Sequence, residues 1–245
     1  SGQITPQVIG GPYNGKLRFK SAPPQFTAGV EQEVQVELLD DFNNPTIADN
    51  TVSITFTRSD SVTGEFSVNG TSWSTSVTTN IPAGTGDVTV LYRDTKAGSV
   101  TIQAAQTDVP IRRVSYTPSI VAAAPAKYIY TSNPQIIARN TASQPITIEI
   151  QDQYNNPASA PNGFALTINT TSATGEFSVD GSSGWTNGSL LVPFAEGASS
   201  VSVYYRDGTN GTYTLDVSGN GLTGASQNIR VVEALPNKIV LLSSG

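Results

Sequence analysis

The stretch LLDDFNNPTIADNTVSITF (38–56) has a near-copy later in the chain, IQDQYNNPASAPNGFALTI (150–168). In each copy an alternating apolar run ends in Asp, Asn-Asn-Pro follows, and a second alternating run begins. A period of two is typical of a strand with one buried face, and Asn, Asp and Pro favour tight turns. Each copy therefore predicts two strands separated by an Asp–Asn-Asn-Pro turn.

Other segments repeat at nearly the same interval. Lys16, Lys127 and Lys238 each open an apolar run, and consecutive members are 111 residues apart. TGEFSVNGTSW (63–73) matches TGEFSVDGSSGW (174–185), and the Tyr-Arg-Asp of VTVLYRDTKAGSVTI (88–102) recurs in VSVYYRDGTNGTYTL (201–215). A fixed period of this kind indicates tandem repeats, here two complete units of a longer array.

The spacing sets the predicted boundaries. Repeat 1 is assigned to 16–115 and repeat 2 to 127–235. Between them, YTPSIVAAAPA (116–126) contains two prolines and is predicted to be a stiff, extended Pro/Ala-rich linker. Residues 1–15 are assigned to the tail of a preceding unit or a cloning remnant, and 236–245 to the truncated start of a third repeat.

Each repeat is predicted to contain about seven short strands, which is typical of an immunoglobulin-like β-sandwich. No segment of useful length shows the 3.6-residue apolar stripe of a helix. We therefore predict an all-β chain of two tandem immunoglobulin-like β-sandwich domains in an extended arrangement. In the first copy the predicted strands lie at 16–20, 34–38, 51–57, 65–68, 87–92, 98–104 and 109–115.

The Asp–Asn-Asn-Pro turn and IPAGTGDVTVLYRDTKAGSVTIQAA (81–105) together resemble the bacterial immunoglobulin-like repeats of large cell-surface proteins. That family includes invasin- and intimin-type adhesins and surface-layer proteins. The resemblance covers both repeats. It implies an extracellular, rod-like stalk or lattice module, in which ligand binding is confined to particular repeats.

Composition excludes several kinds of chemistry. The 245 residues include no Cys, Met or His, which rules out disulfides, thiol nucleophiles and imidazole bases from this chain. The net charge of −6 argues against nucleic acid as a partner, and no apolar run approaches the roughly 20 residues that cross a bilayer. Glu65 and Asp94 are the best carboxylate pair for a glycosidase, but nothing marks a cleft around them, so we predict a non-catalytic protein.

Aromatic residues at matched positions have two interpretations each. Trp73 and Trp185 either stack on a sugar ring or pack against the sandwich, and the absence of a second aromatic beside them favours packing. Tyr92 and Tyr205 precede Arg-Asp at a strand end. Their hydroxyls are predicted to bond to backbone across the corner, as in a tyrosine corner.

Oxygen-bearing side chains at matched positions form the candidate site. One interpretation is local, in which the Asp side chain caps its own turn and Pro fixes the backbone. The other is a Ca²⁺ ion between repeats, with Asp94 and Glu65 on one side and Asp152, Asn155 and Asn156 on the other, because Ca²⁺ prefers carboxylate and amide oxygens. The residues assigned to either role are Asp40, Asn43, Glu65, Asp94, Asp152, Asn155, Glu176 and Asp207.

Two functions remain open. The first is a structural stalk or lattice module at the cell surface, whose partners are neighbouring repeats of the same chain. The second is an adhesin module that binds a surface glycan or a host protein. The second predicts that one repeat carries extra aromatic or charged loop residues.

Overall fold

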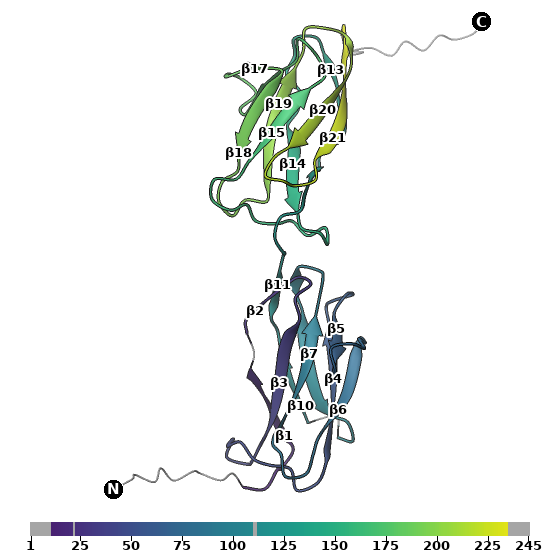
Figure 1. Ribbon diagram of the computed structural model, residues 1–245, viewed down its shortest axis with the longest axis vertical. Helices are drawn as coiled ribbons and strands as arrows, with labels where there is room; N and C mark the ends of the chain where they lie inside the picture. Colours follow the sequence, from purple (N-terminus) through teal and green to yellow (C-terminus); the bar gives the residue numbers. More distant parts are fainter. Residues whose placement is uncertain (1–10, 22, 110–111, 235–245) are drawn as a thin grey trace, which may run out of the picture. The chain divides into compact units, whose positions relative to one another are not determined.

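The computed structural model describes residues 11–21, 23–109 and 112–234. These residues form 21 strands and no helix, so the all-β prediction is confirmed. The chain divides into two compact units, unit 1 within residues 1–122 and unit 2 within 123–245, each with its own sheets (Figure 1). The predicted start of a third repeat at 236–245 lies outside the described residues.

Unit 1 has two four-stranded sheets, ordered β1-β3-β7-β5 and β10-β9-β4-β6, and a small third sheet, β2-β11-β8. Pairing is antiparallel except between β2 and β11. The strands are β1 (Lys16–Ser21), β2 (Gln25–Thr27), β3 (Gln32–Leu39), β4 (Val52–Ser59), β5 (Glu65–Ser67), β6 (Ser76–Ile81), β7 (Asp87–Arg93), β8 (Gly98–Ser99), β9 (Thr101–Gln106), β10 (Arg113–Tyr116) and β11 (Ser119–Val121).

Unit 2 has two five-stranded sheets, ordered β12-β14-β19-β16-β17 and β13-β21-β20-β15-β18. Here the parallel pair is β13 with β21. The strands are β12 (Lys127–Tyr130), β13 (Ile136–Ala138), β14 (Ile146–Gln151), β15 (Ala165–Thr170), β16 (Glu176–Ser178), β17 (Thr186–Asn187), β18 (Ser189–Pro193), β19 (Ser200–Arg206), β20 (Gly211–Ser218) and β21 (Ala225–Val232).

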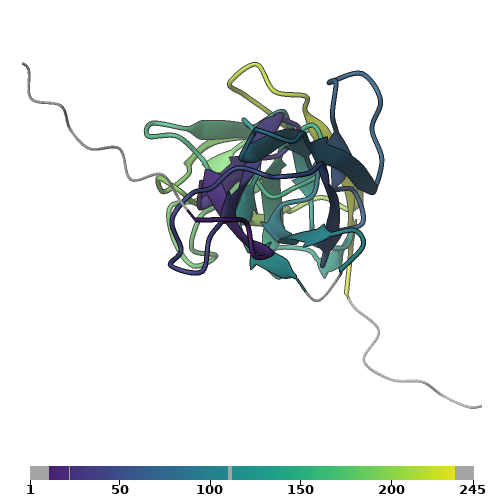
Figure 2. The same ribbon diagram turned by 90° about the horizontal axis from the view of Figure 1, so that it is seen from below.

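The core of each unit lies between its two main sheets. Figure 2 gives the view from below, in which the strands are foreshortened. In unit 1 the alternating residues of β4 place Ile54 and Phe56 inside at 0% exposure, and the Phe56 ring lies 6.2 Å from that of Phe66 in the opposite sheet. In unit 2, Ile148 of β14 and Ile168 of β15 are equally buried. Period-two sequences thus supply both inner faces, which confirms the predicted sandwich.

The predicted linker at 116–126 is too long at its start. Ser119–Val121 form β11, which pairs with β2 in parallel and with β8 in antiparallel register, so this segment belongs to unit 1. Pro118 lacks an N–H and separates β10 from β11, and this break looks like linker in the sequence. The division between the units falls after Ala122.

Besides β11, two strands of unit 1 were not predicted, β2 and β6. Strand β6 (SVTTNI) pairs only with β4 at the edge of its sheet, and most of its residues are exposed or half-buried. A polar edge strand has no apolar alternation to reveal it.

Truncation of a core aromatic ring tests the packing of unit 1. Phe66→Ala removes a ring that is 0% exposed and lies 4.9 Å from the Tyr92 ring, so the free energy of unfolding of unit 1 should fall by about 3–5 kcal/mol. Urea titration followed by the NMR signals of unit 1 measures it. Phe42→Ala is the control because Phe42 is 82% exposed, and an equal loss in both variants would contradict the assigned core.

Candidate functional site

The Asp–Asn-Asn-Pro turn of unit 1 is organised by a buried carboxylate. Asp40 is only 2% exposed. Its Oδ1 accepts hydrogen bonds from the backbone N–H groups of Phe42 at 2.9 Å and Asn44 at 2.8 Å, and its Oδ2 accepts one from Asn44 Nδ2 at 3.2 Å. Since an ionised group removed from water needs donors in place of its hydration shell, the carboxylate stabilises the turn from the inside.

Unit 2 repeats this arrangement. Asp152 is 0% exposed, and its Oδ1 accepts from the backbone N–H groups of Tyr154 at 2.8 Å and Asn156 at 2.9 Å. Asn156 Nδ2 donates to Oδ2 at 2.8 Å. The first Asn of each Asn-Asn-Pro also has a role. Asn43 and Asn155 adopt a left-handed backbone conformation, with φ of 65° and 68°, which Asn tolerates better than most residues.

A further donor to each carboxylate comes from outside the turn. Gly11 N donates to Asp40 Oδ2 at 2.9 Å, and Ala123 N donates to Asp152 Oδ2 at 2.9 Å. Both residues lie in the chain just before the first strand of their unit, and we call 11–15 and 123–126 the entry segments. Each buried Asp therefore joins its turn to the segment through which the chain enters the unit.

The hydrogen bonds also keep these carboxylates ionised. Burial alone would raise the pKa of Asp40 and of Asp152. The donors from the turn and the entry segment outweigh it and hold both pKa values below the ordinary range.

The Tyr-Arg-Asp corner contains a second buried carboxylate. Asp94 is 3% exposed and accepts from Tyr92 Oη at 2.8 Å, Ser61 Oγ at 2.6 Å, Thr63 Oγ1 at 2.5 Å and Lys96 N at 3.0 Å. Burial by itself would raise its pKa, but these donors lower it below the usual value. The predicted tyrosine bond to backbone is therefore wrong, because the hydroxyl donates to the carboxylate two residues later.

The corner of unit 2 is built alike. Asp207 accepts from Tyr205 Oη at 2.7 Å, Thr174 Oγ1 at 2.6 Å and Thr209 N at 2.9 Å. The Gly of Thr-Gly-Glu is required in both copies, because a Cβ at Gly64 or Gly175 would lie 2.2 Å from the tyrosine oxygen. The matched Thr-Gly-Glu and Tyr-Arg-Asp motifs thus form one packed corner.

An ion pair on the outer side of each corner holds the tryptophan. Arg93 lies 2.9 Å from Glu65 Oε2, and its guanidinium carbon is 4.0 Å from the centroid of the Trp73 ring. In unit 2, Arg206 pairs with Glu176 at 2.7 Å and lies 4.3 Å from the Trp185 ring. Both tryptophans are half-buried, with a cation over one face, so the predicted packing role fits this geometry.

The turn and the corner lie at opposite ends of a unit. Tyr92 pairs with Gln32 at the start of β3, whereas Asp40 follows the end of β3, so roughly 25 Å of strand separates the two carboxylates. No group of three or more Asp or Glu side chains placed to hold a metal occurs in the described part of the chain. Within each unit the predicted ligands therefore form two sets, each already bound by protein donors. This arrangement favours turn capping and does not test a calcium ion between repeats.

No protein-family model matches the chain, and no curated protein matches it. Similar solved structures include the Escherichia coli adhesin FdeC, at 16% identity, 92% coverage of this chain, 67% of that chain and a TM-score of 0.43. Domains 4 and 5 of the S-layer protein SbsC align at 13% identity, 89% and 96% coverage and a TM-score of 0.34. Adhesins and surface-layer proteins are the classes that the sequence motifs resemble.

A β-glycosidase from Bacteroides vulgatus also aligns, at 14% identity and a TM-score of 0.37, over 88% of this chain but 24% of that chain. In the described residues there is no helix of the length and apolarity needed to span a membrane.

Acid should destabilise the protein through the buried carboxylates. Their folded-state pKa values lie below those of the unfolded chain, so their stabilisation is present above about pH 5 and is lost as pH falls below about 4. We expect the melting temperature to fall between pH 6 and pH 3, and to fall less in Asp207→Asn. Asp49→Asn, which changes an exposed carboxylate, is the control. A melting temperature that does not change over this range would contradict the assignment.

Calcium titration separates turn capping from metal binding. Because protein donors already occupy the carboxylate oxygens of Asp40, Asp94, Asp152 and Asp207, millimolar Ca²⁺ should change the melting temperature by less than about 1 °C. Differential scanning calorimetry in Ca²⁺ and in excess chelator measures this. A saturable rise that chelator removes would instead establish the calcium site.

Proposed function

We propose that the chain is a non-catalytic repeat module of a bacterial cell-surface or secreted protein, which spaces or presents other domains. The observation that carries the proposal is the bond from each buried Asp to the entry segment of its unit. A spacer must transmit position from one repeat to the next. It therefore needs the connecting chain to be held by the folded unit.

Few residues separate the anchored ends of the two units. Val121 is the last residue of β11, and its carbonyl accepts a hydrogen bond from Ala28 N at 2.8 Å within unit 1. Ala123 N is bonded to Asp152 in unit 2 at 2.9 Å. Ala122 alone lies between these two anchors, and one residue contributes two soft backbone dihedrals.

The carboxylates support a structural role over a catalytic one. Glu65 is ion-paired with Arg93, and Asp94 is buried among four donors that keep its pKa low. A general acid needs the opposite, a raised pKa near the working pH. The expected setting is extracellular, with neighbouring repeats of the same chain as partners.

Release of the entry segment tests the spacer role. Asp152→Asn keeps the volume and one acceptor oxygen, but it places an amide N–H₂ where Oδ2 now accepts from Ala123 N and Asn156 Nδ2. We expect greater independent motion of the two units, measured by the separate rotational correlation times from ¹⁵N relaxation of the full chain.

The matched control is Asp40→Asn, which makes the same change at the entry segment of unit 1. It should lower stability in the same way and leave the motion between the units unchanged. Equal effects of the two variants on the correlation times, or no effect of either, would contradict the proposal.

One feature of unit 1 favours ligand binding as a second role. A basic pocket lies beside its entry segment, and the backbone closes the corresponding place in unit 2.

A further inference from the structure

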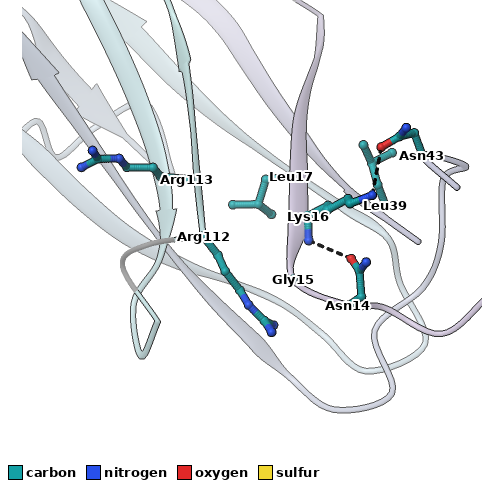
Figure 3. A pocket seen from close by; sticks show the side chains of 8 residues that line it. All are labelled: Asn14, Gly15, Lys16, Leu17, Leu39, Asn43, Arg112 and Arg113. Atoms are coloured by element: carbon teal, nitrogen blue, oxygen red, sulfur yellow. Dashed lines mark hydrogen bonds between the residues drawn. The ribbon is translucent and has the colours of Figure 1, made fainter. Parts of the chain in front are cut away.

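The pocket lies between the entry segment of unit 1, the start of β1 and the residues just before β10 (Figure 3). It is open to solvent, with a volume of about 400 Å³. Its polar lining comprises Asn14, Lys16, Asn43, Arg112 and Arg113. Three of the chain's 13 Lys and Arg residues therefore gather here, in a protein whose net charge is −6.

The cations of the pocket are not neutralised by ion pairs. The salt bridges found among the described residues use other cations. Lys16 Nζ donates to the carbonyl of Asp41 at 2.7 Å and to Asn43 Oδ1 at 3.4 Å, and both acceptors are neutral. The Asp41 carboxylate at the rim is exposed and accepts from Asn14 Nδ2. The pocket thus keeps an excess of positive charge.

Gly15 leaves room for the Arg112 side chain. A Cβ at Gly15 would lie 2.0 Å from Arg112 Nη1, so the guanidinium lies directly against the glycine backbone, which has a φ of 96°. In Figure 3 the Arg112 side chain is directed toward Asn14, whereas Arg113 is directed away from Lys16. Lys16 Nζ is directed toward Asn43, so Arg112 is the cation of the lining whose guanidinium is placed to contact a bound group.

The same place is closed in unit 2. Thr223 lies 111 residues after Arg112, the interval that also relates Lys16 to Lys127. Thr223 N donates to Ala126 O at 3.0 Å, and Tyr128 N donates to Thr223 O at 2.9 Å, so backbone pairing joins this hairpin to β12.

The backbone of Arg112 has different hydrogen-bond partners from that of Thr223. Its N–H donates to Val109 O at 2.9 Å and its carbonyl accepts from Gln106 N at 3.0 Å, both within its own hairpin. The two copies therefore differ in a way that gives unit 1 a pocket lined by charged residues.

We propose that this pocket binds the carboxylate or sulfate group of an acidic glycan. The Arg112 guanidinium suits an oxyanion because arginine offers it paired donors, and Lys16 adds positive charge to the same lining. The Nδ2 group of Asn43 in the same lining can donate to a sugar hydroxyl. A shallow, polar and open site suits a sugar better than an apolar peptide anchor. This role does not depend on the spacer role.

The test is an NMR titration of the full chain with three oligosaccharides. Oligogalacturonate carries carboxylates, a heparin tetrasaccharide carries sulfates, and maltotetraose is neutral. We expect saturable shifts of the Lys16, Leu17 and Arg112 amides with at least one acidic sugar and none with the neutral one. Binding should weaken as salt rises, because exposed charges are screened.

Substitutions identify the site. Arg112→Thr, which installs the residue found in unit 2, and Lys16→Gln should each weaken binding about fivefold or more. The matched control, Lys127→Gln, changes the equivalent lysine of unit 2 and should leave affinity unchanged, and melting temperatures verify that all variants fold. The proposal is wrong if neither acidic sugar gives saturable shifts, if Lys127→Gln weakens binding equally, or if a hexa-aspartate peptide binds as tightly as the sugars.

Discussion

A carboxylate that loses contact with water must gain protein donors, and this requirement organises both ends of each unit. Hydrogen-bond donors of the protein surround Asp40 and Asp152 at one end of their units, and Asp94 and Asp207 at the other. Each buried oxygen fixes the position of the backbone or hydroxyl groups that donate to it. The chain has few charged residues, and several of those it repeats are used in this way.

The two ends use the same principle for different purposes. At the corner, the donors are side chains and backbone of nearby loops, so the carboxylate stabilises the end of the sandwich itself. At the turn, one donor is the backbone of the entry segment, so the carboxylate also holds the chain that arrives from outside the unit. Of the two carboxylate sites, the turn is therefore the one that connects folding within a unit to the chain entering it.

Much of the fold follows from sequence patterns. Alternation in β3 and β14 predicts strands with one buried face, and the repeated Asp–Asn-Asn-Pro predicts the capped turn. Strand β6 was missed because a polar edge strand lacks the pattern, and β11 was missed because Pro118 interrupts the strand before it. The prediction for Tyr92 named the wrong acceptor, since sequence does not show that Asp94 is turned inward.

The sequence predicts the side chains of the candidate site but not the backbone groups that bind to them. The partners of Asp40 and Asp152 outside the turn are the backbone N–H groups of Gly11 and Ala123, which any residue except proline supplies. The pocket beside Arg112 depends on a backbone path that differs from the one at Thr223. Neither feature corresponds to a pattern of residue types in the sequence.

Hydrogen exchange at Ala123 tests the central claim most directly. If Asp152 holds the entry segment, the Ala123 amide should exchange about tenfold or more slowly than that of its exposed neighbour Ala124, and Asp152→Asn should remove the difference. Equal exchange of the two amides in the native protein would show that the segment is not held.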